Sequence, residues 1–198
     1  MKRIVICMDG TWQTLDQERP TNIGIIARSI AHKETIADPR GGEKYIQQTV
    51  LYTQGVGSTM GTFPGAGFFD RFNAEVTRAI GGAFGVGLEE SVLNTYLRLA
   101  FNYEDGDQIY LFGFSRGAYA ARRLSGFINT AGIVSRRHTD QALKGFQLYQ
   151  SKPRDGATAE QHQEHEAKAL EFRRAYGKGA RNEDGTRRAV DAPPPNRA

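Results

Sequence analysis

A short, uninterrupted run of apolar residues near the start of the chain, residues 4–8, places the strongest limit on the fold. A strand with one wet face alternates apolar and polar residues, whereas a continuous run is typical of a strand covered on both faces of a parallel sheet. Lys2 and Arg3 precede the run and imitate a signal peptide, but Asp9 ends it after five residues. That is too short for a secretory core or a membrane span, so we predict a buried first strand.

The segments that follow alternate between helical and strand-like patterns. Apolar residues recur at helical spacing in residues 23–30 and 88–103, and small and apolar residues indicate a further helix at 118–128. Residues 45–52 and 109–112 are rich in β-branched and aromatic side chains, as strands are. This order predicts an α/β fold of three layers with a mainly parallel sheet.

The C-terminal part of the chain has a different character. Downstream of residue 135 no apolar run is long enough for a buried strand, and residues 159–176 have the pattern of one charged helix. The remainder is rich in Gly, Pro, Arg and Asn, a composition typical of disorder. We therefore predict an α/β domain in residues 1–150, followed by a charged helix and a disordered tail in residues 151–198.

Composition excludes several classes of function. The single cysteine, Cys7, rules out an internal disulfide framework and a multi-cysteine zinc site. The net charge is +4, but the basic residues are scattered and form no stripe interleaved with aromatics, so we expect no nucleic-acid partner. His162 and His165 have a spacing that can chelate a metal, yet they lie among Gln and Glu, which favours a solvated helix face. No glycine-rich nucleotide motif occurs, and we expect neither a metal nor a cofactor.

The motif that points to chemistry is G-x-S-x-G, formed by Gly113, Ser115 and Gly117. A predicted strand leads into it and a predicted helix follows, which is the setting of a nucleophile elbow. The glycines leave room for a sharp turn, and the turn lifts the serine hydroxyl above the end of the sheet. The backbone N–H of Arg116, at the start of the helix, is then aimed at a developing oxyanion. The alternative is an ordinary tight turn with a serine facing solvent.

A second candidate element is the loop after the first strand, which begins Asp9-Gly10-Thr11-Trp12. Ligands bind beyond the carboxyl ends of parallel strands, and both this loop and Ser115 fall at that edge. Gly10 or Thr11 is therefore a candidate for the second oxyanion N–H donor. The alternative, which we weigh equally, is that Asp9 only caps the loop and Trp12 fills the core.

The same loop is similar to the D-x-D-G-T start of haloacid-dehalogenase-type phosphatases. In that chemistry the first aspartate is the nucleophile, and here Cys7 stands in its place. The phosphatase interpretation is therefore poor.

Longer stretches of the first 150 residues carry a more specific resemblance. They are VICMDGTW at 5–12, TN at 21–22, YTQGVGS at 52–58, GGAFGVGL at 81–88 and GDQIYLFGFSRGAY at 106–119. Together they resemble the uncharacterised α/β-hydrolase domain family that includes the catalytic domain of type VI secretion phospholipase effectors. The resemblance implies an α/β-hydrolase-like fold, a Ser–Asp–His triad and a phospholipid ester substrate.

The chain departs from this pattern after the serine. The acid and the histidine of a triad follow the nucleophile, each in a loop after a strand, but no strand-like segment follows Ser115. His138 falls in a predicted helix–helix connection, and the next histidines lie in the charged helix. We expect an apparently truncated member, incomplete at its C-terminus, in which the triad acid and base are not found.

Two functional hypotheses remain. The first is a serine ester hydrolase of the lipase or phospholipase type, inactive or incomplete as this chain. The second is a non-catalytic, degenerate hydrolase domain that binds lipid or a protein partner. With no signal peptide, we expect a cytoplasmic protein or an effector secreted by a route that needs no signal. We also expect transient contact with a membrane surface, and self-association through an exposed sheet edge.

Overall fold

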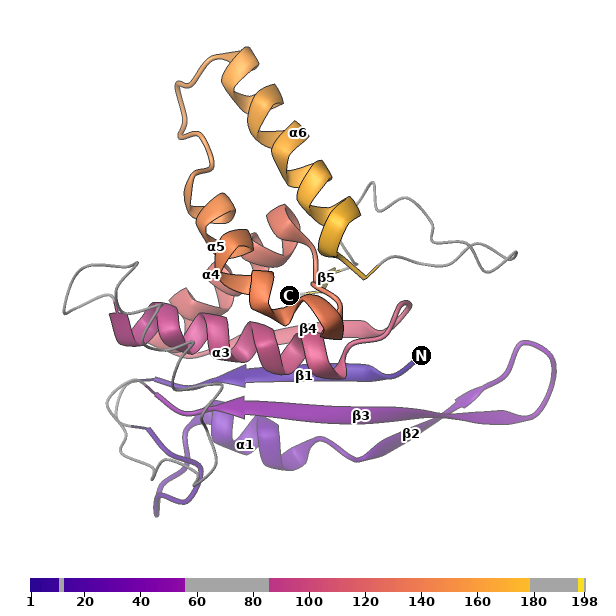
Figure 1. The fold of residues 1–198 in the computed structure, drawn as a ribbon. Helices are drawn as coiled ribbons and strands as arrows, with labels where there is room; N and C mark the ends of the chain where they lie inside the picture. Colours follow the sequence, from indigo (N-terminus) through magenta and orange to yellow (C-terminus); the bar gives the residue numbers. More distant parts are fainter. Residues whose placement is uncertain (11–12, 56–85, 179–195, 198) are drawn as a thin grey trace.

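The computed structural model describes residues 1–10, 13–55, 86–178 and 196–197, and its described part is built on one mixed sheet (Figure 1). The strand order is β2-β3-β1-β4-β5. The strands are β1 (Arg3–Met8), β2 (Lys33–Ala37), β3 (Glu43–Thr53), β4 (Gln108–Gly113) and β5 (Asn196–Arg197). The helices are α1 (Asn22–Ser29), α3 (Val86–Asn102), α4 (Arg116–Ala131), α5 (Ala142–Gln150) and α6 (Ala159–Tyr176), with a 3₁₀ helix, η1 (Arg136–Gln141).

The α/β class is confirmed, and the sheet is mixed, with three parallel pairings and one antiparallel pairing among the described strands. β1 pairs in parallel with β3 and β4, and β4 pairs in parallel with β5, whereas β2 runs antiparallel to β3. The turn at residues 38–42 closes the β2–β3 hairpin, which extends beyond the rest of the sheet (Figure 1). The sequence KETIA of β2 has no apolar run that could have predicted this edge strand.

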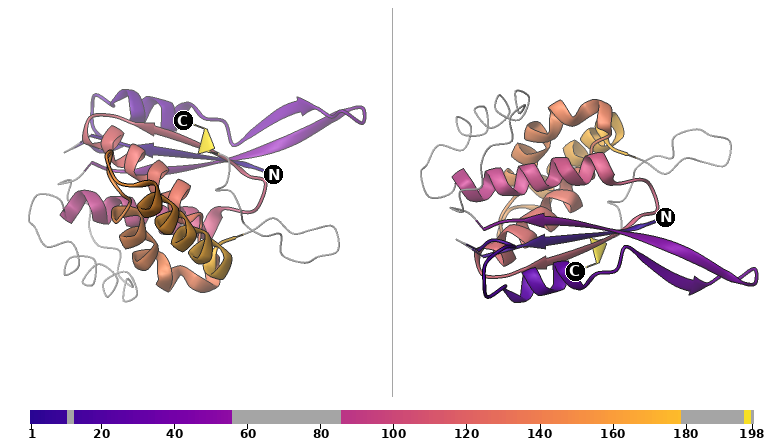
Figure 2. Two further views of the ribbon diagram at one scale, coloured as in Figure 1. Left: turned by 90° about the horizontal axis from the view of Figure 1, so that it is seen from above. Right: turned by 90° about the horizontal axis from the view of Figure 1, so that it is seen from below.

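The first strand is buried on both faces, as its apolar run predicted. Ile4, Ile6 and Met8 belong to a large core cluster that includes residues of α3 and α4. Val5 and Cys7 face the other way and pack with Ile23 of α1 in a smaller cluster. Figure 2 shows α1 on one side of the sheet and the remaining helices on the other. The strand is therefore the middle of three layers.

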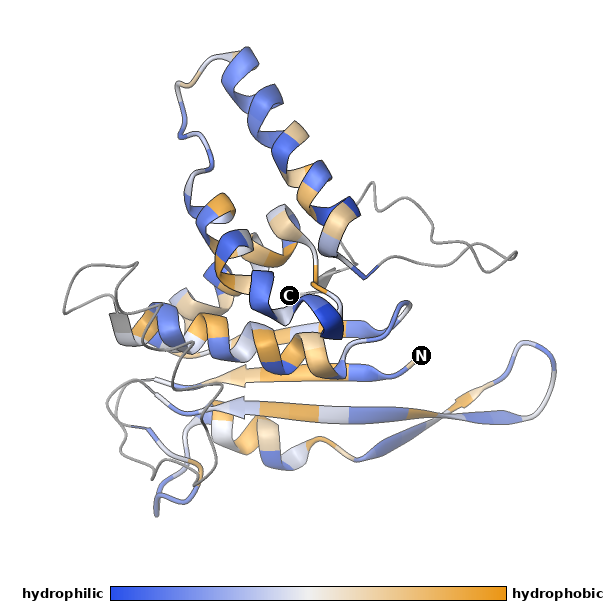
Figure 3. Ribbon diagram, in the orientation of Figure 1, coloured by the Kyte–Doolittle hydropathy of each residue, from blue (hydrophilic) through white to orange (hydrophobic). Residues whose placement is uncertain are grey.

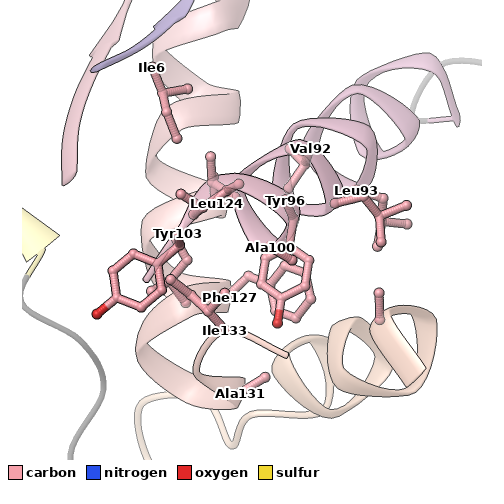
Figure 4. Close-up of a cluster of buried hydrophobic side chains, with 14 of the residues drawn as sticks. Ile6, Val92, Leu93, Tyr96, Ala100, Tyr103, Leu124, Phe127, Ala131 and Ile133 are labelled. Carbon is pink, nitrogen blue, oxygen red and sulfur yellow. The ribbon is translucent and has the colours of Figure 1, made fainter. Parts of the chain in front are cut away.

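Aromatic rings meet inside the larger core, where Tyr96 and Phe127 lie together (Figure 4). Tyr96 of α3 stacks on Phe127 of α4 with ring centroids 3.9 Å apart, and Phe127 meets Phe146 of α5 edge to face at 5.2 Å. The Tyr96 hydroxyl donates to the carbonyl of Gly132 at 2.9 Å and accepts from the N–H of Val134 at 3.0 Å. This one side chain therefore fixes both the helix pair and the chain that leaves α4.

The charged helix predicted at residues 159–176 is present with the same bounds, as α6. Most of its surface is hydrophilic (Figure 3), yet Phe172 joins the large core. Arg173 is 2% exposed, and its Nη1 donates to the carbonyl of Thr130 at 2.7 Å while its Nη2 pairs with Glu166 at 2.6 Å. The packing thus continues past residue 150, where we expected a boundary, and the division into two segments stays a prediction.

A buried carboxylate joins the starts of β1 and β4. Asp107 is 2% exposed and accepts hydrogen bonds from the backbone N–H of Lys2 at 2.7 Å, from Lys2 Nζ at 2.5 Å and from the N–H of Glu104 at 2.9 Å. Burial on its own would raise the pKa of Asp107, but the bonds to Lys2 and Glu104 outweigh it and hold the pKa below its usual range. The carboxylate therefore stabilises this end of the sheet in its charged form.

We predict that Asp107→Asn lowers the free energy of unfolding by about 2 kcal/mol at pH 7, because one charged acceptor of three donors is lost. The folded-state pKa lies below the ordinary 3.8, so the stabilisation is present above about pH 4 and is lost as the pH falls through the folded value. Urea unfolding of both proteins at pH 7 and pH 3 checks this. An equal difference at the two pH values would contradict it.

Candidate functional site

A sharp turn separates β4 from α4, and Ser115 sits at its apex. Ser115 has φ 55° and ψ −123°, and among the described residues no other non-glycine residue has a positive φ. Backbone of this kind costs about 1–3 kcal/mol and persists only where the surroundings impose it. The strand, the turn and the helix predicted around the motif are all present.

The Ser115 hydroxyl does not cap the helix that it precedes. Thr21 and Thr158 occupy the same N-cap position before α1 and α6, with extended backbone, and their side-chain oxygens accept from the N–H groups of Gly24 and Gln161. Ser115 makes no such capping bond. Among the described residues its hydroxyl has no hydrogen-bond partner, and the residue is exposed. The hydroxyl is therefore available for chemistry.

The two glycines of the motif are required by space. A Cβ atom on Gly113 would lie 2.5 Å from the carbonyl oxygen of Gly117, and one on Gly117 would lie 2.1 Å from the carbonyl oxygen of Met8. Contacts below 3.0 Å essentially never occur for real Cβ atoms. The start of α4 therefore rests directly on the backbone at the end of β1.

The loop after β1 reaches Ser115. The N–H of Phe114 donates to the carbonyl of Met8 at 3.1 Å, which extends the β1–β4 pairing into the turn. A Cβ atom on Gly10 would lie 3.4 Å from the Cβ of Ser115 and 3.0 Å from the Phe114 ring. Sequence reasoning placed this loop and the serine at the same edge of the sheet, and the structure brings Gly10 and Ser115 together.

The N–H groups proposed as oxyanion donors differ in whether they already donate a hydrogen bond. The Gly10 N–H donates to Oδ1 of Asp9 at 2.8 Å, so that Asp9 caps the loop. The Arg116 N–H, in the first turn of α4, has no acceptor among the described residues, as is usual for a helix start. Thr11 and Trp12 lie outside the described residues.

A cluster around Asp9 was missed by sequence reasoning. Asp9 is 3% exposed, and its Oδ2 accepts from the Thr21 hydroxyl at 2.6 Å and from the Tyr52 hydroxyl at 2.7 Å. Burial, and then the hydrogen bond to Asp9, raise the pKa of Tyr52. The three residues lie in the stretches that carry the resemblance, but nothing in their spacing indicates that they meet.

Cys7, which occupies the nucleophile position of the phosphatase alternative, points into the small core. It is fully buried, and burial followed by the charge of Asp9 raises its pKa to about 11. A thiol with that pKa is protonated at neutral pH and is not a nucleophile. The phosphatase interpretation finds no support.

Two of the four histidines lie at the opposite end of the molecule from Ser115. The carbonyl of His32 accepts from Gln48, which pairs with Arg3 at the start of β1, whereas Ser115 lies beyond its end. His138 follows α4, whose 16 residues separate it from Ser115 by roughly 24 Å of helix. Its Nδ1 contacts the hydroxyl of Ser135 at 3.0 Å.

The other two histidines belong to α6. His165 directs Nε2 to the carbonyl of Leu148 on α5, at 2.9 Å, and so joins the two helices, while His162 is exposed. No histidine hydrogen-bonds Ser115 in the part of the chain that the structure describes. Within that part, no three His, Cys, Asp or Glu side chains gather where they could hold a metal ion.

Comparison with known proteins identifies a family for this chain. Residues 2–191 match the family described as the catalytic domain of type VI secretion system phospholipase effectors of the Tle1-like kind. The chain belongs to this family. The resemblance inferred from the sequence is thereby confirmed, and the description of the family names a phospholipase catalytic domain.

One curated relative is an uncharacterised protein of Saccharomyces cerevisiae, YEL023C. It is 28% identical over 150 residues, which cover 75% of this chain and 20% of the yeast protein. The chain thus spans about a fifth of the length of that relative. No solved structure matches the chain. No helix in the described ranges is both long and apolar enough to cross a membrane.

We predict that Gly117→Ala lowers the free energy of unfolding by about 3 kcal/mol, because the new methyl group overlaps the backbone of β1. The matched control is Gly24→Ala in α1, where an added Cβ has its nearest atom at 3.5 Å. That change should leave stability equal or raise it by about 0.5 kcal/mol, since alanine favours helix. Thermal unfolding of the two variants decides the point, and similar losses in both would refute the close approach.

Proposed function

We propose that this chain carries the nucleophile of a serine ester hydrolase of the lipase or phospholipase type, on an α/β-hydrolase-like framework, with Ser115 as the attacking residue. One observation supports the proposal above the others. The serine stands in a strained backbone conformation at the carboxyl end of a central strand, and its hydroxyl caps nothing. Strained backbone conformations of this kind are concentrated at functional sites.

In the proposed reaction, Ser115 Oγ attacks the acyl carbonyl carbon, and the carbonyl oxygen becomes an oxyanion. The N–H of Arg116 is the first donor to that oxygen, assisted by the positive end of the α4 dipole. The second donor comes from the loop after β1, from Gly10 or Thr11. Because the Gly10 N–H already donates to Asp9, Thr11 is the favoured donor.

A general base must take the proton of Ser115, and loss of the base removes most of the catalysis. No imidazole lies beside Ser115 in the described part of the chain. We propose that the acid and the base come from residues outside that part.

The surroundings of Ser115 fit a lipid ester. Phe114 and Tyr119 are 50% and 52% exposed, which is high for aromatic side chains. Arg116 and Arg122 are exposed beside them. Exposed aromatics next to basic side chains suit the boundary between acyl chains and anionic headgroups, so we propose transient contact with a membrane surface here.

A second candidate function is a non-catalytic domain that binds lipid through the same surface. The observation that favours it is the separation of His32 and His138 from Ser115 by the length of the sheet and of α4. A non-catalytic domain would share the proposed membrane contact but would have no reactive serine. Labelling of Ser115 therefore distinguishes the hydrolase from the binding domain.

We expect a fluorophosphonate probe to label the purified chain at Ser115, and Ser115→Ala to abolish the labelling. The elbow and the oxyanion donors activate the site for phosphonylation, while the lack of an imidazole beside Ser115 among the described residues keeps the rate about 10²-fold or more below that of a complete triad. Mass spectrometry of the labelled peptide identifies the site. Labelling of equal yield in Ser115→Ala, or none in the unaltered chain, would favour the binding domain.

We expect the Ser115→Ala protein to sediment with vesicles of phosphatidylcholine and phosphatidylglycerol, and less with phosphatidylcholine alone. Adding Tyr119→Ser should lower the partition coefficient about threefold or more, because a buried aromatic ring at the interface is lost. The matched control is Tyr45→Ser, since Tyr45 is 64% exposed but belongs to the distant β2–β3 hairpin. Equal losses in the two variants would count against the proposed surface.

A further inference from the structure

We infer that Asp9 is the positioning residue of the site: its carboxylate holds the loop after β1 against Ser115. The inference rests on the proposed function, since it assigns a residue to the same reaction. Asp9 does not touch the reacting atoms in this account. It acts through the backbone of Gly10, which lies beside Ser115.

Both carboxylate oxygens of Asp9 are occupied by hydrogen-bond donors. Oδ1 accepts from the Gly10 N–H at 2.8 Å, and Oδ2 accepts from the hydroxyls of Thr21 and Tyr52 at 2.6 and 2.7 Å. The residue is only 3% exposed, so water competes little for these bonds. Bonds to a buried charged acceptor are about twice as strong as neutral ones. The side chain therefore has one well-defined position.

The three donors come from three separate elements. Gly10 follows β1, Tyr52 is near the end of β3, and Thr21 is the N-cap of α1. Thr21 also accepts from the Gly24 N–H at 3.0 Å, so its hydroxyl serves the helix and Asp9 together. Asp9 thus fixes the loop relative to the sheet and to the helix on its far face.

The loop held in this way is in contact with the turn at Ser115. A Cβ atom on Gly117 would lie 2.5 Å from the carbonyl oxygen of Asp9, and one on Gly10 would lie 3.4 Å from the Ser115 Cβ. A shift of the Asp9 backbone therefore moves Gly10 relative to the hydroxyl. A misplacement of about 1 Å costs on the order of 10²-fold in rate.

Substitutions at Asp9 differ in which of its three hydrogen bonds they remove. An asparagine has one oxygen, which can still accept from the Gly10 N–H while its NH₂ group donates to the hydroxyls of Thr21 and Tyr52. Hydroxyl groups can rotate to accept, whereas a backbone N–H cannot. Asn therefore preserves the loop in part, and Ala leaves all three donors without an acceptor.

The sheet provides a matched control at its other end. Asp107 is also a buried carboxylate with three hydrogen bonds, at the starts of β1 and β4. Its removal destabilises the same sheet without touching the loop after β1. If Asp9 has a purely structural role, substitutions at Asp9 and Asp107 that lower stability equally should slow the labelling of Ser115 equally.

The experiment measures the rate of fluorophosphonate labelling of Ser115, together with Tm, at a temperature where every variant is folded. We expect Asp9→Ala to slow labelling at least tenfold, Asp9→Asn to restore it to within about threefold, and Asp107→Ala to leave it unchanged. Tyr52→Phe removes only one donor and should slow labelling about twofold, which keeps the test available if Asp9→Ala does not fold. Labelling at the unaltered rate in Asp9→Ala and Tyr52→Phe, or equal slowing in Asp107→Ala, would overturn the inference.

A second readout separates this inference from the proposed function. If Ser115 is not labelled even in the unaltered chain, the hydrolase proposal fails, and amide hydrogen exchange at Gly10 and at Phe114, whose N–H donates to Met8, then decides the role of Asp9. Faster exchange at both amides in Asp9→Ala than in Asp107→Ala, compared at equal Tm, supports positioning. Equal exchange in the two variants overturns it.

Discussion

The described structure depends on one close approach, between the start of α4 and the end of β1. No side chain fits between Gly117 and the carbonyl oxygen of Met8, where an added Cβ would lie at 2.1 Å. Because α4 cannot withdraw without losing its packing on the sheet, the chain between β4 and α4 must turn within very few residues. The positive φ of Ser115 is the result of that geometric requirement, and the hydroxyl is lifted clear of both elements.

The cores on the two faces of the sheet impose this approach. On one face Phe127 of α4 stacks on Tyr96, and the Tyr96 hydroxyl holds the chain that leaves the helix. On the other face α1 packs against Cys7, and its N-cap, Thr21, bonds to Asp9. The loop after β1 is thus fixed from the α1 side and the turn from the α4 side, and the two meet at Ser115.

The elements that could be predicted from the sequence are those with a strong local pattern. The apolar run of β1, the helical spacing in α3 and the motif between β4 and α4 each follow from neighbouring residues. The strand β2 was missed because its pattern is mostly polar, and α5 was not predicted either. The cluster around Asp9 could not be predicted, since its partners lie 12 and 43 positions away and meet only when the sheet forms.

The identity of the residue at position 115 is itself an argument about function. Glycine adopts a positive φ at no steric cost, whereas serine there carries strain of about 1–3 kcal/mol. An ordinary N-cap serine would offset such a cost by bonding the helix, as Thr21 and Thr158 do, but Ser115 makes no capping bond. The fold thus places an uncompensated, exposed hydroxyl at the carboxyl end of a central strand, beside an N–H that begins a helix. A nucleophile needs that arrangement, and a structural turn does not.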